Sequence, residues 1–194
     1  EEIAAAVLDL LADHLDLAEQ LRSWQEQAEA GKPTPGQEAL QQARDQQRAA
    51  MERAEQATQQ IEQALERVQH DPFSTYETYA DMQALQRNMM HLQNTLLPQL
   101  QQSLQGMRPQ SPATAQLQQP QQQLEAVVQE LERLSSFAEH IATSEKLNDV
   151  AQLSNKLLDE QNKLLAALDN LPKDFQGGNL PPELQKMLDA LESL

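Results

Sequence analysis

The sequence predicts an all-α protein, an elongated antiparallel helical bundle of coiled-coil-like hairpins with one long C-terminal helix. Apolar residues recur at alternating steps of three and four, which places them on one side of a helix. The 194 residues include only 5 Gly, and most of the 10 Pro fall in clusters, while the strong helix formers Ala, Leu, Gln, Glu and Arg are abundant. Hydrophobic residues reach 39% and aromatic residues 3%, too few for a wide core but enough for helices that each bury one stripe.

Residues 2–30 carry the clearest pattern and are predicted to form the first helix. Apolar side chains follow steps of four and three along a coiled-coil seam, which is interrupted by one polar residue, His14. The seam positions are Ile3, Val7, Leu10, His14, Leu17, Leu21, Trp24 and Ala28. Gly31 and Pro33 are expected to end this helix, because neither residue favours its continuation.

Residues 35–70 are predicted to form the second helix. We expect Thr34 to cap it, with Pro35 at the first helical position and Gln37 completing a capping box. Its seam is Leu40, Gln47, Met51, Ala54, Thr58, Ile61, Leu65 and Val68. The first half of the seam is small and polar, which predicts either close packing or weak packing. The Asp71-Pro72 step should break the helix.

A third helix is predicted over residues 75–105, capped by Ser74 with Glu77 completing the box. Its stripe is Tyr79, Met82, Leu85, Met89, Leu92 and Leu96, continued on a shifted face by Leu100, Leu104 and Met107. Pro98 lies inside the pattern and should kink or split the helix. Because tight breaks join the three helices, residues 1–105 are expected to fold as a three-helix antiparallel bundle.

The rest of the chain is predicted to contain a connection, a long helical segment and a short final helix. Pro and Gln dominate residues 106–123, which we interpret as the connection. Residues 124–171 should pack on the bundle as one helix or two. Their seam begins with Leu124, Val127, Leu131, Leu134, Ala138 and Ile141, and a new frame begins at Leu147 and Val150 and continues through Leu157, Leu164, Leu168 and Leu171. One helix is favoured because no Gly or Pro lies between the frames, although Asp149 could cap a new start. Residues 172–194 should form a loop and a short helix over about 181–193.

Charge and composition exclude several classes of function. The net charge of −16 and the pI of about 4.5 repel phosphate backbones and anionic lipid surfaces, so nucleic-acid binding is not expected, whereas a basic protein partner remains open. The absence of Cys removes disulfides and thiolate chemistry. No apolar stretch is long enough for membrane insertion by this segment itself. Since the sequence opens Glu-Glu-Ile without Met, we expect a piece of a longer protein.

No catalytic, cofactor-binding or metal-ligating residues are predicted, and no cofactor is expected. The four histidines, His14, His70, His91 and His140, lack the spacing of metal ligands on one helix face. His14 is the unusual one because it occupies a seam position, where a polar residue often fixes register. We interpret it as structural, with pH sensing as the alternative.

Acidic residues crowd the first helix and form the second candidate surface. It carries eight acids, counting Glu1 and Glu2, against one base, Arg22. The other acids are Asp9, Asp13, Asp16, Glu19, Glu26 and Glu29. We interpret these side chains as a solvated face, and a docking face for a basic partner or weak cation binding is the functional alternative.

Methionines and tyrosines form a third cluster, on residues 75–105. It consists of Tyr76, Tyr79, Met82, Met89 and Met90. Helical spacing favours core packing over an adaptable partner-binding patch. Trp24, the sole Trp, is interpreted as a packing anchor at the end of the first helix.

Two stretches resemble the soluble helical regions of membrane-anchored bacterial envelope proteins of uncharacterised function. They are residues 71–98, DPFSTYETYADMQALQRNMMHLQNTLLP, and residues 153–191, LSNKLLDEQNKLLAALDNLPKDFQGGNLPPELQKMLDAL. The resemblance covers about a third of the chain. It implies a membrane-tethered parent in the bacterial cell envelope, and it implies no chemistry.

We therefore expect a non-enzymatic structural or protein-interaction module that presents helical faces or acts as a spacer. Its protein partner is not identified by the sequence, and self-association is a variant of the same function. The alternative is a small-ligand-binding or sensor bundle with a pocket near Met82 and Met90, because helical bundles hold ligands between their helices.

Overall fold

The computed structural model describes residues 2–32, 35–71, 74–109 and 114–169, with the side chains of 164, 165 and 167–169 left aside. Every element in these ranges is helical, which confirms the predicted all-α bundle with a long C-terminal helix. The helices are α1 (Glu2–Glu29), α2 (Gln37–His70), α3 (Tyr76–His91), the π-helical turn η1 (Leu92–Leu96), α4 (Leu97–Gly106) and α5 (Ala115–Asp169). The predicted short helix over 181–193 lies outside the described residues.

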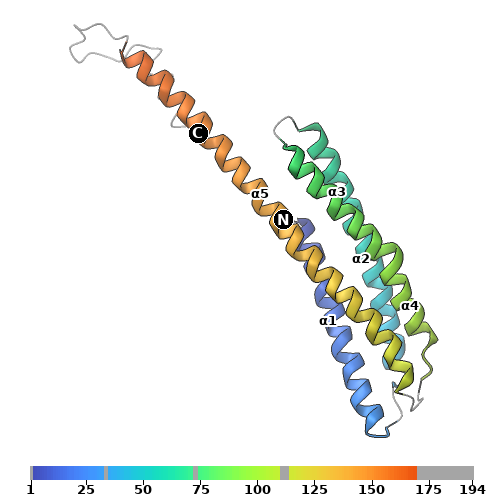
Figure 1. Ribbon diagram of the computed structural model, residues 1–194. Coiled ribbons are helices and arrows are strands. Elements are labelled where there is room, and N and C mark those ends of the chain that lie inside the picture. The colour runs from blue at the N-terminus through green and yellow to red at the C-terminus, as the bar shows by residue number, and fades with distance from the viewer. Residues whose placement is uncertain (1, 33–34, 72–73, 110–113, 170–194) are drawn as a thin grey trace. The chain divides into compact units, whose positions relative to one another are not determined.

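The chain divides into two compact units, Glu1–Thr143 and Ser144–Leu194. The first unit contains α1, α2, the continuous segment of α3, η1 and α4, and the beginning of α5, which lie side by side (Figure 1). The described part of the second unit is the remainder of α5, residues 144–169. None of the described helices is both long enough and apolar enough to cross a membrane.

Side-chain contacts show that neighbouring helices of the first unit run antiparallel, as predicted. Between α1 and α2, Asp13 pairs with Arg53 and Gln20 with Gln46, so positions later in α1 meet positions earlier in α2. Between α2 and the segment from α3 to α4, the same inverse order holds. Its contacts are Arg44 with Leu104, Gln47 with Leu97, Thr58 with Gln93, and Glu62 with Gln86. At the other end of α1, Gln25 contacts Gln121 of α5.

One hydrophobic core joins the helices of the first unit. The apolar seam residues predicted for the first helix, and those predicted from Leu124 to Ile141, are buried in it, except that Ile3 is partly buried. They are Val7, Leu10, Leu17, Leu21, Trp24 and Ala28, with Leu124, Val127, Leu131, Leu134, Ala138 and Ile141. Helix α2 contributes mainly alanines to this core, at Ala43, Ala50, Ala54 and Ala57, each 2% exposed or less. Of the first half of the predicted seam, Leu40, Gln47 and Ala54 are therefore buried, while Met51 is partly buried.

Helix α1 ends as its glycine predicts. Gly31 has φ of +73°, a left-handed conformation that glycine adopts without steric cost. The amide of Gly31 donates to the Ala28 carbonyl at 3.0 Å, and the amide of Lys32 donates to the Gln27 carbonyl at 3.0 Å. This pair of bonds is the Schellman motif, which satisfies carbonyls that the last turn leaves open.

The predicted starts of the next two helices are wrong by one or two residues. Helix α2 begins at Gln37 with Gly36 as its N-cap and without a side-chain capping bond from that residue, and the predicted cap, Thr34, lies outside the described residues. Helix α3 is capped by Thr75, whose hydroxyl accepts from the Thr78 amide at 3.1 Å, and not by Ser74. Neighbouring Ser and Thr both suit an N-cap, and sequence alone does not decide between them.

Pro98 splits the third predicted helix, in agreement with expectation. Just before it, in η1, the Leu97 amide donates to the Leu92 carbonyl five residues earlier, which widens the turn. The Pro98 ring then lies in the first turn of α4, where its missing N–H removes no helical bond. The residues expected at 75–105 therefore form α3, η1 and α4 in series.

The predicted connection over 106–123 is too long. Helix α4 ends at Gly106 and α5 begins at Ala115, so residues 115–123 are helical and Pro120 lies inside α5. Although proline disfavours a helix interior, glutamine is a good helix former, and one proline near a helix start leaves only one carbonyl without its helical donor.

Helix α5 is one continuous helix of 55 residues, which confirms the favoured single-helix prediction through the frame change near Thr143. In the first unit, α5 is buried along its apolar seam as far as Ile141. In the second unit, described by itself, the large apolar residues from Leu147 to Leu158 are exposed. A heptad-like pattern indicates that a helix can pack against another helix, but the pattern is the same whether or not such a helix is present.

Candidate functional site

The histidines differ sharply in environment. His70, His91 and His140 are exposed, whereas His14 is 1% exposed inside the core. No group of three or more His, Asp or Glu able to hold a metal ion occurs among the described residues. The histidine to explain is therefore the one that the seam pattern singled out.

His14 is positioned by its own helix. Its Nδ1 lies 2.7 Å from the Leu10 carbonyl one turn earlier in α1. A carbonyl oxygen can only accept, so Nδ1 carries the proton and donates. In the neutral imidazole Nε2 then holds a lone pair, and this buried atom has no hydrogen-bond partner.

Gln47 lies opposite His14 on α2 and is equally buried, at 1% exposed. Its Nε2 donates to the Leu97 carbonyl at 3.4 Å, which orients the amide. Its Oε1 is buried without a partner. Two polar side chains from facing helices thus interrupt an apolar core, and each has one buried atom without a hydrogen-bond partner. Burying such an atom without a partner costs free energy of folding.

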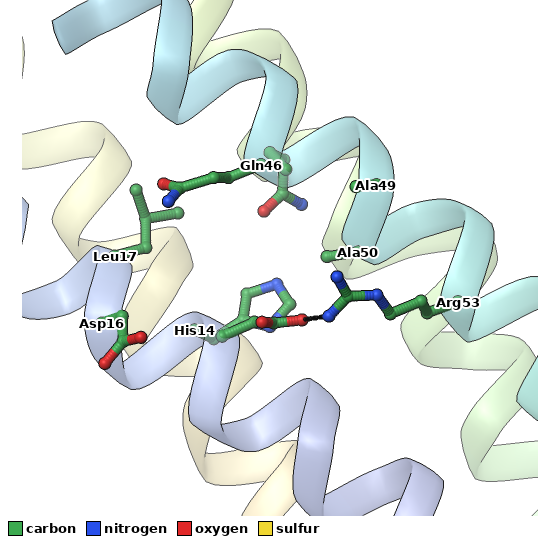
Figure 2. Close-up of a pocket in the computed structure, with 9 residues that line it drawn as sticks. His14, Asp16, Leu17, Gln46, Ala49, Ala50 and Arg53 are labelled. Carbon is green, nitrogen blue, oxygen red and sulfur yellow. Dashed lines mark hydrogen bonds and ion pairs between the residues drawn. The ribbon is translucent and has the colours of Figure 1, made fainter.

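A pocket of about 90 Å³ opens at this polar layer between α1 and α2. Figure 2 shows His14 and Leu17 extending from α1 toward α2, which supplies Ala50 and Arg53 on the other side. At the mouth, Arg53 forms an ion pair with Asp13. The remaining lining residues are Asp16, Gln46, Gln47 and Ala49.

Burial lowers the pKa of His14 below its ordinary value of 6.5, because the charged ring would lose its hydration. The Leu10 carbonyl, the Asp13 charge and the Gln47 side chain oppose this effect but do not outweigh it. His14 is therefore neutral at pH 7, and its Nε2 is an acceptor there.

The acidic surface of α1 is exposed, with one exception at its middle. Asp9, Asp16, Glu26 and Glu29 are exposed, while Asp13 is half-buried and paired with Arg53 of α2. This ion pair offsets part of the repulsion among the acidic side chains of α1. Its contribution to the free energy of unfolding is small, because both side chains are substantially exposed.

The methionine cluster is mainly a core feature, as favoured by its spacing. Met82 and Met89 are buried, at 3% and 0% exposed, whereas Met90 and Tyr76 are exposed. The pocket described above lies between α1 and α2, away from the position near Met82–Met90 that the ligand-binding alternative assumed. Trp24 is buried at 7% exposed, consistent with a packing anchor.

Two arginines were missed by sequence reasoning. Arg44 of α2 donates to three carbonyls at the end of α4, those of Leu104 at 3.0 Å, Gln105 at 3.0 Å and Met107 at 2.9 Å. It thereby satisfies open carbonyls and places a positive charge at the negative end of the helix dipole. Arg53 closes the pocket. Both contacts join residues at least 40 positions apart, for which a single sequence carries no local signal.

A second candidate site is the exposed apolar stripe of α5, defined here as Leu147, Val150, Leu153, Leu157 and Leu158. Their side chains are 65%, 59%, 45%, 38% and 54% exposed, respectively. Five large apolar residues within 12 positions of one helix exceed the scattered single exposures that a soluble surface normally carries. Such a stripe is typical of a binding surface for another helix.

Comparison of this chain with protein-family models, with curated proteins and with solved structures gives no match.

Proposed function

We propose that this protein is a non-enzymatic interaction module that presents the apolar stripe of α5 to a protein partner. The observation that carries the proposal is the change within one continuous helix from buried residues, ending at Ile141, to exposed ones, beginning at Leu147. The buried part anchors the helix in the first unit. The exposed part supplies residues at the three- and four-residue steps by which one amphipathic helix recognises another.

Charge favours a basic partner over a second copy of the chain. The net charge is −16, so two copies repel each other, and the surface of α1 contributes many of the exposed carboxylates. Along residues 144–169, acidic residues also outnumber basic ones. A helix with an apolar face flanked by Lys and Arg complements both properties, and its association should weaken as salt increases.

The test uses the full chain and a designed amphipathic peptide of Leu and Lys as the probe. Fluorescence anisotropy should show binding that weakens with added salt. Replacing two stripe residues together, Leu147→Ser and Leu157→Ser, should weaken it at least about tenfold, a loss of about 1.4 kcal/mol. The matched control is Asn155→Ser, because Asn155 is an exposed polar residue of the same helix segment.

Two results would contradict this proposal. Peptide affinity that is equal for the wild type and the double variant would show that the stripe does not bind it. Sedimentation that reveals a dimer abolished by the same double substitution would assign the stripe to self-association and refute the choice of a basic partner.

Following the resemblance of residues 71–98 and 153–191, we also propose that the module is part of a membrane-tethered protein of the bacterial cell envelope. The complete gene product tests this. A hydrophobic segment encoded before Glu1 would support it, and a full-length product without an anchor would exclude it.

A further inference from the structure

The pocket between α1 and α2 contains two buried atoms that can only accept hydrogen bonds at neutral pH. Nε2 of His14 is an acceptor because Nδ1 holds the proton against the Leu10 carbonyl. Oε1 of Gln47 is an acceptor because the amide nitrogen faces the Leu97 carbonyl. Two acceptors cannot satisfy each other, so a donor between them is needed to offset the cost of their burial.

We propose that this pocket binds a small molecule that presents two or more N–H or O–H donors to His14 Nε2 and Gln47 Oε1. Water and a small organic cation of the guanidinium class share this chemistry. This site is independent of the apolar stripe, because all of its residues belong to the first unit.

The size and charge of the pocket fit this class of ligand. One water needs only about 10–15 Å³ of such space, so a pocket of about 90 Å³ accommodates several waters or a molecule of a few heavy atoms. The charged lining residues are Asp13, Asp16 and Arg53. With His14 neutral, carboxylates outnumber cations in the lining, and Arg53 is already engaged by Asp13. The balance favours a cationic donor over an anion.

Proton uptake by His14 competes with this ligand. Once protonated, Nε2 becomes a donor and is directed at Gln47 Oε1, so both acceptors are consumed at once. The charged groups that line the pocket are Asp13 and Asp16 on α1 and Arg53 on α2, and none of them supplies a further buried acceptor. Because burial lowers the pKa of His14 from 6.5, binding should be constant at pH 7 and above and should weaken only in more acidic solution.

The experiment is nitrogen-15 NMR of the His14 imidazole in the full chain, titrated with methylguanidinium. We expect the Nδ1-protonated tautomer, with an Nε2 signal that shifts on titration. Gln47→Leu should weaken methylguanidinium binding at least about tenfold. Gln42→Leu is the matched control, since Gln42 is an exposed glutamine of the same helix. Far-ultraviolet circular dichroism of Gln47→Leu, compared with that of the wild type, separates loss of the site from loss of the fold.

Each other outcome has a defined meaning. An Nε2 signal that shows an accepted hydrogen bond but does not respond to methylguanidinium supports the site with water as its ligand. A proton on Nε2 at neutral pH, or an Nε2 that accepts no hydrogen bond, overturns the proposal. Binding that is unchanged in Gln47→Leu would also overturn it.

Discussion

Replacing Leu131 by Ala tests whether α5 is anchored by its buried part alone. Leu131 is 0% exposed in the core of the first unit, whereas Leu147, on the same helix, is 65% exposed. The same substitution at these two positions makes a matched pair, since both change one leucine to alanine in one continuous helix. Leu and Ala are both good helix formers, so the difference between the variants isolates burial.

The structure fixes the expected size of each effect. Leu131→Ala removes three carbon atoms from a fully buried site, and at about 0.8 kcal/mol each the lost transfer free energy is about 2.4 kcal/mol. The cavity left behind raises the total into the range of about 2–5 kcal/mol. Leu147→Ala removes a side chain already mostly in water and should change the free energy of unfolding by less than about 1 kcal/mol.

Urea unfolding followed by Trp24 fluorescence measures this difference. Trp24 is the sole Trp and is buried in α1, so its signal reports on the first unit alone. With a slope of about 2 kcal/mol per molar urea, Leu131→Ala should lower the midpoint by about 1 M or more. Equal midpoints for the two variants, or a larger shift for Leu147→Ala, would refute the assignment of the core.

Three further perturbations follow from individual contacts. Because burial lowers the folded-state pKa of His14, the unfolded chain binds more protons as the pH falls below 6.5. The contribution of His14 to the free energy of unfolding is therefore fully present above pH 6.5 and is lost as the pH falls below it. His14→Leu should remove this pH dependence from the melting temperature measured across pH. Arg44→Ala should cost about 1–3 kcal/mol in urea unfolding, since it leaves carbonyls at the end of α4 without their donor, and a neutral result would show that water replaces the guanidinium. Gly31→Ala should cost about 1–2 kcal/mol through its φ of +73° alone, because a Cβ there meets no neighbouring atom; an unchanged melting temperature would argue against the left-handed turn.

The helices themselves could be predicted from the sequence because each buries one stripe of apolar residues. The residues of such a stripe are three or four positions apart, so their spacing can be read from a short stretch of sequence. The same spacing marked His14 as a polar residue inside the core. The caps of α2 and α3 were misplaced by one or two residues, since neighbouring residues there have similar capping ability. The pattern also could not distinguish Leu131 from Leu157, because exposure depends on whether another helix is present.

The candidate site could be predicted only in part. Seam position predicted the burial of His14 and Gln47, but their meeting at one pocket depends on the register between α1 and α2. The Asp13–Arg53 and Arg44–Leu104 contacts depend on the same register, which no single helix specifies. In the sequence, Gln47 is one of many glutamines, and only the Leu97 carbonyl gives its amide a fixed orientation.

The alanines of α2 give this protein two opposite kinds of mutational sensitivity. At Ala43, Ala54 and Ala57 only a buried methyl group can be lost, so the greater harm comes from enlargement, which forces the surrounding side chains and backbone to shift. Along the buried part of α5, where leucines fill the space, harm comes from truncation. A random library of variants should therefore show intolerance of bulk in one helix and intolerance of loss in the other, even though both face the same interior.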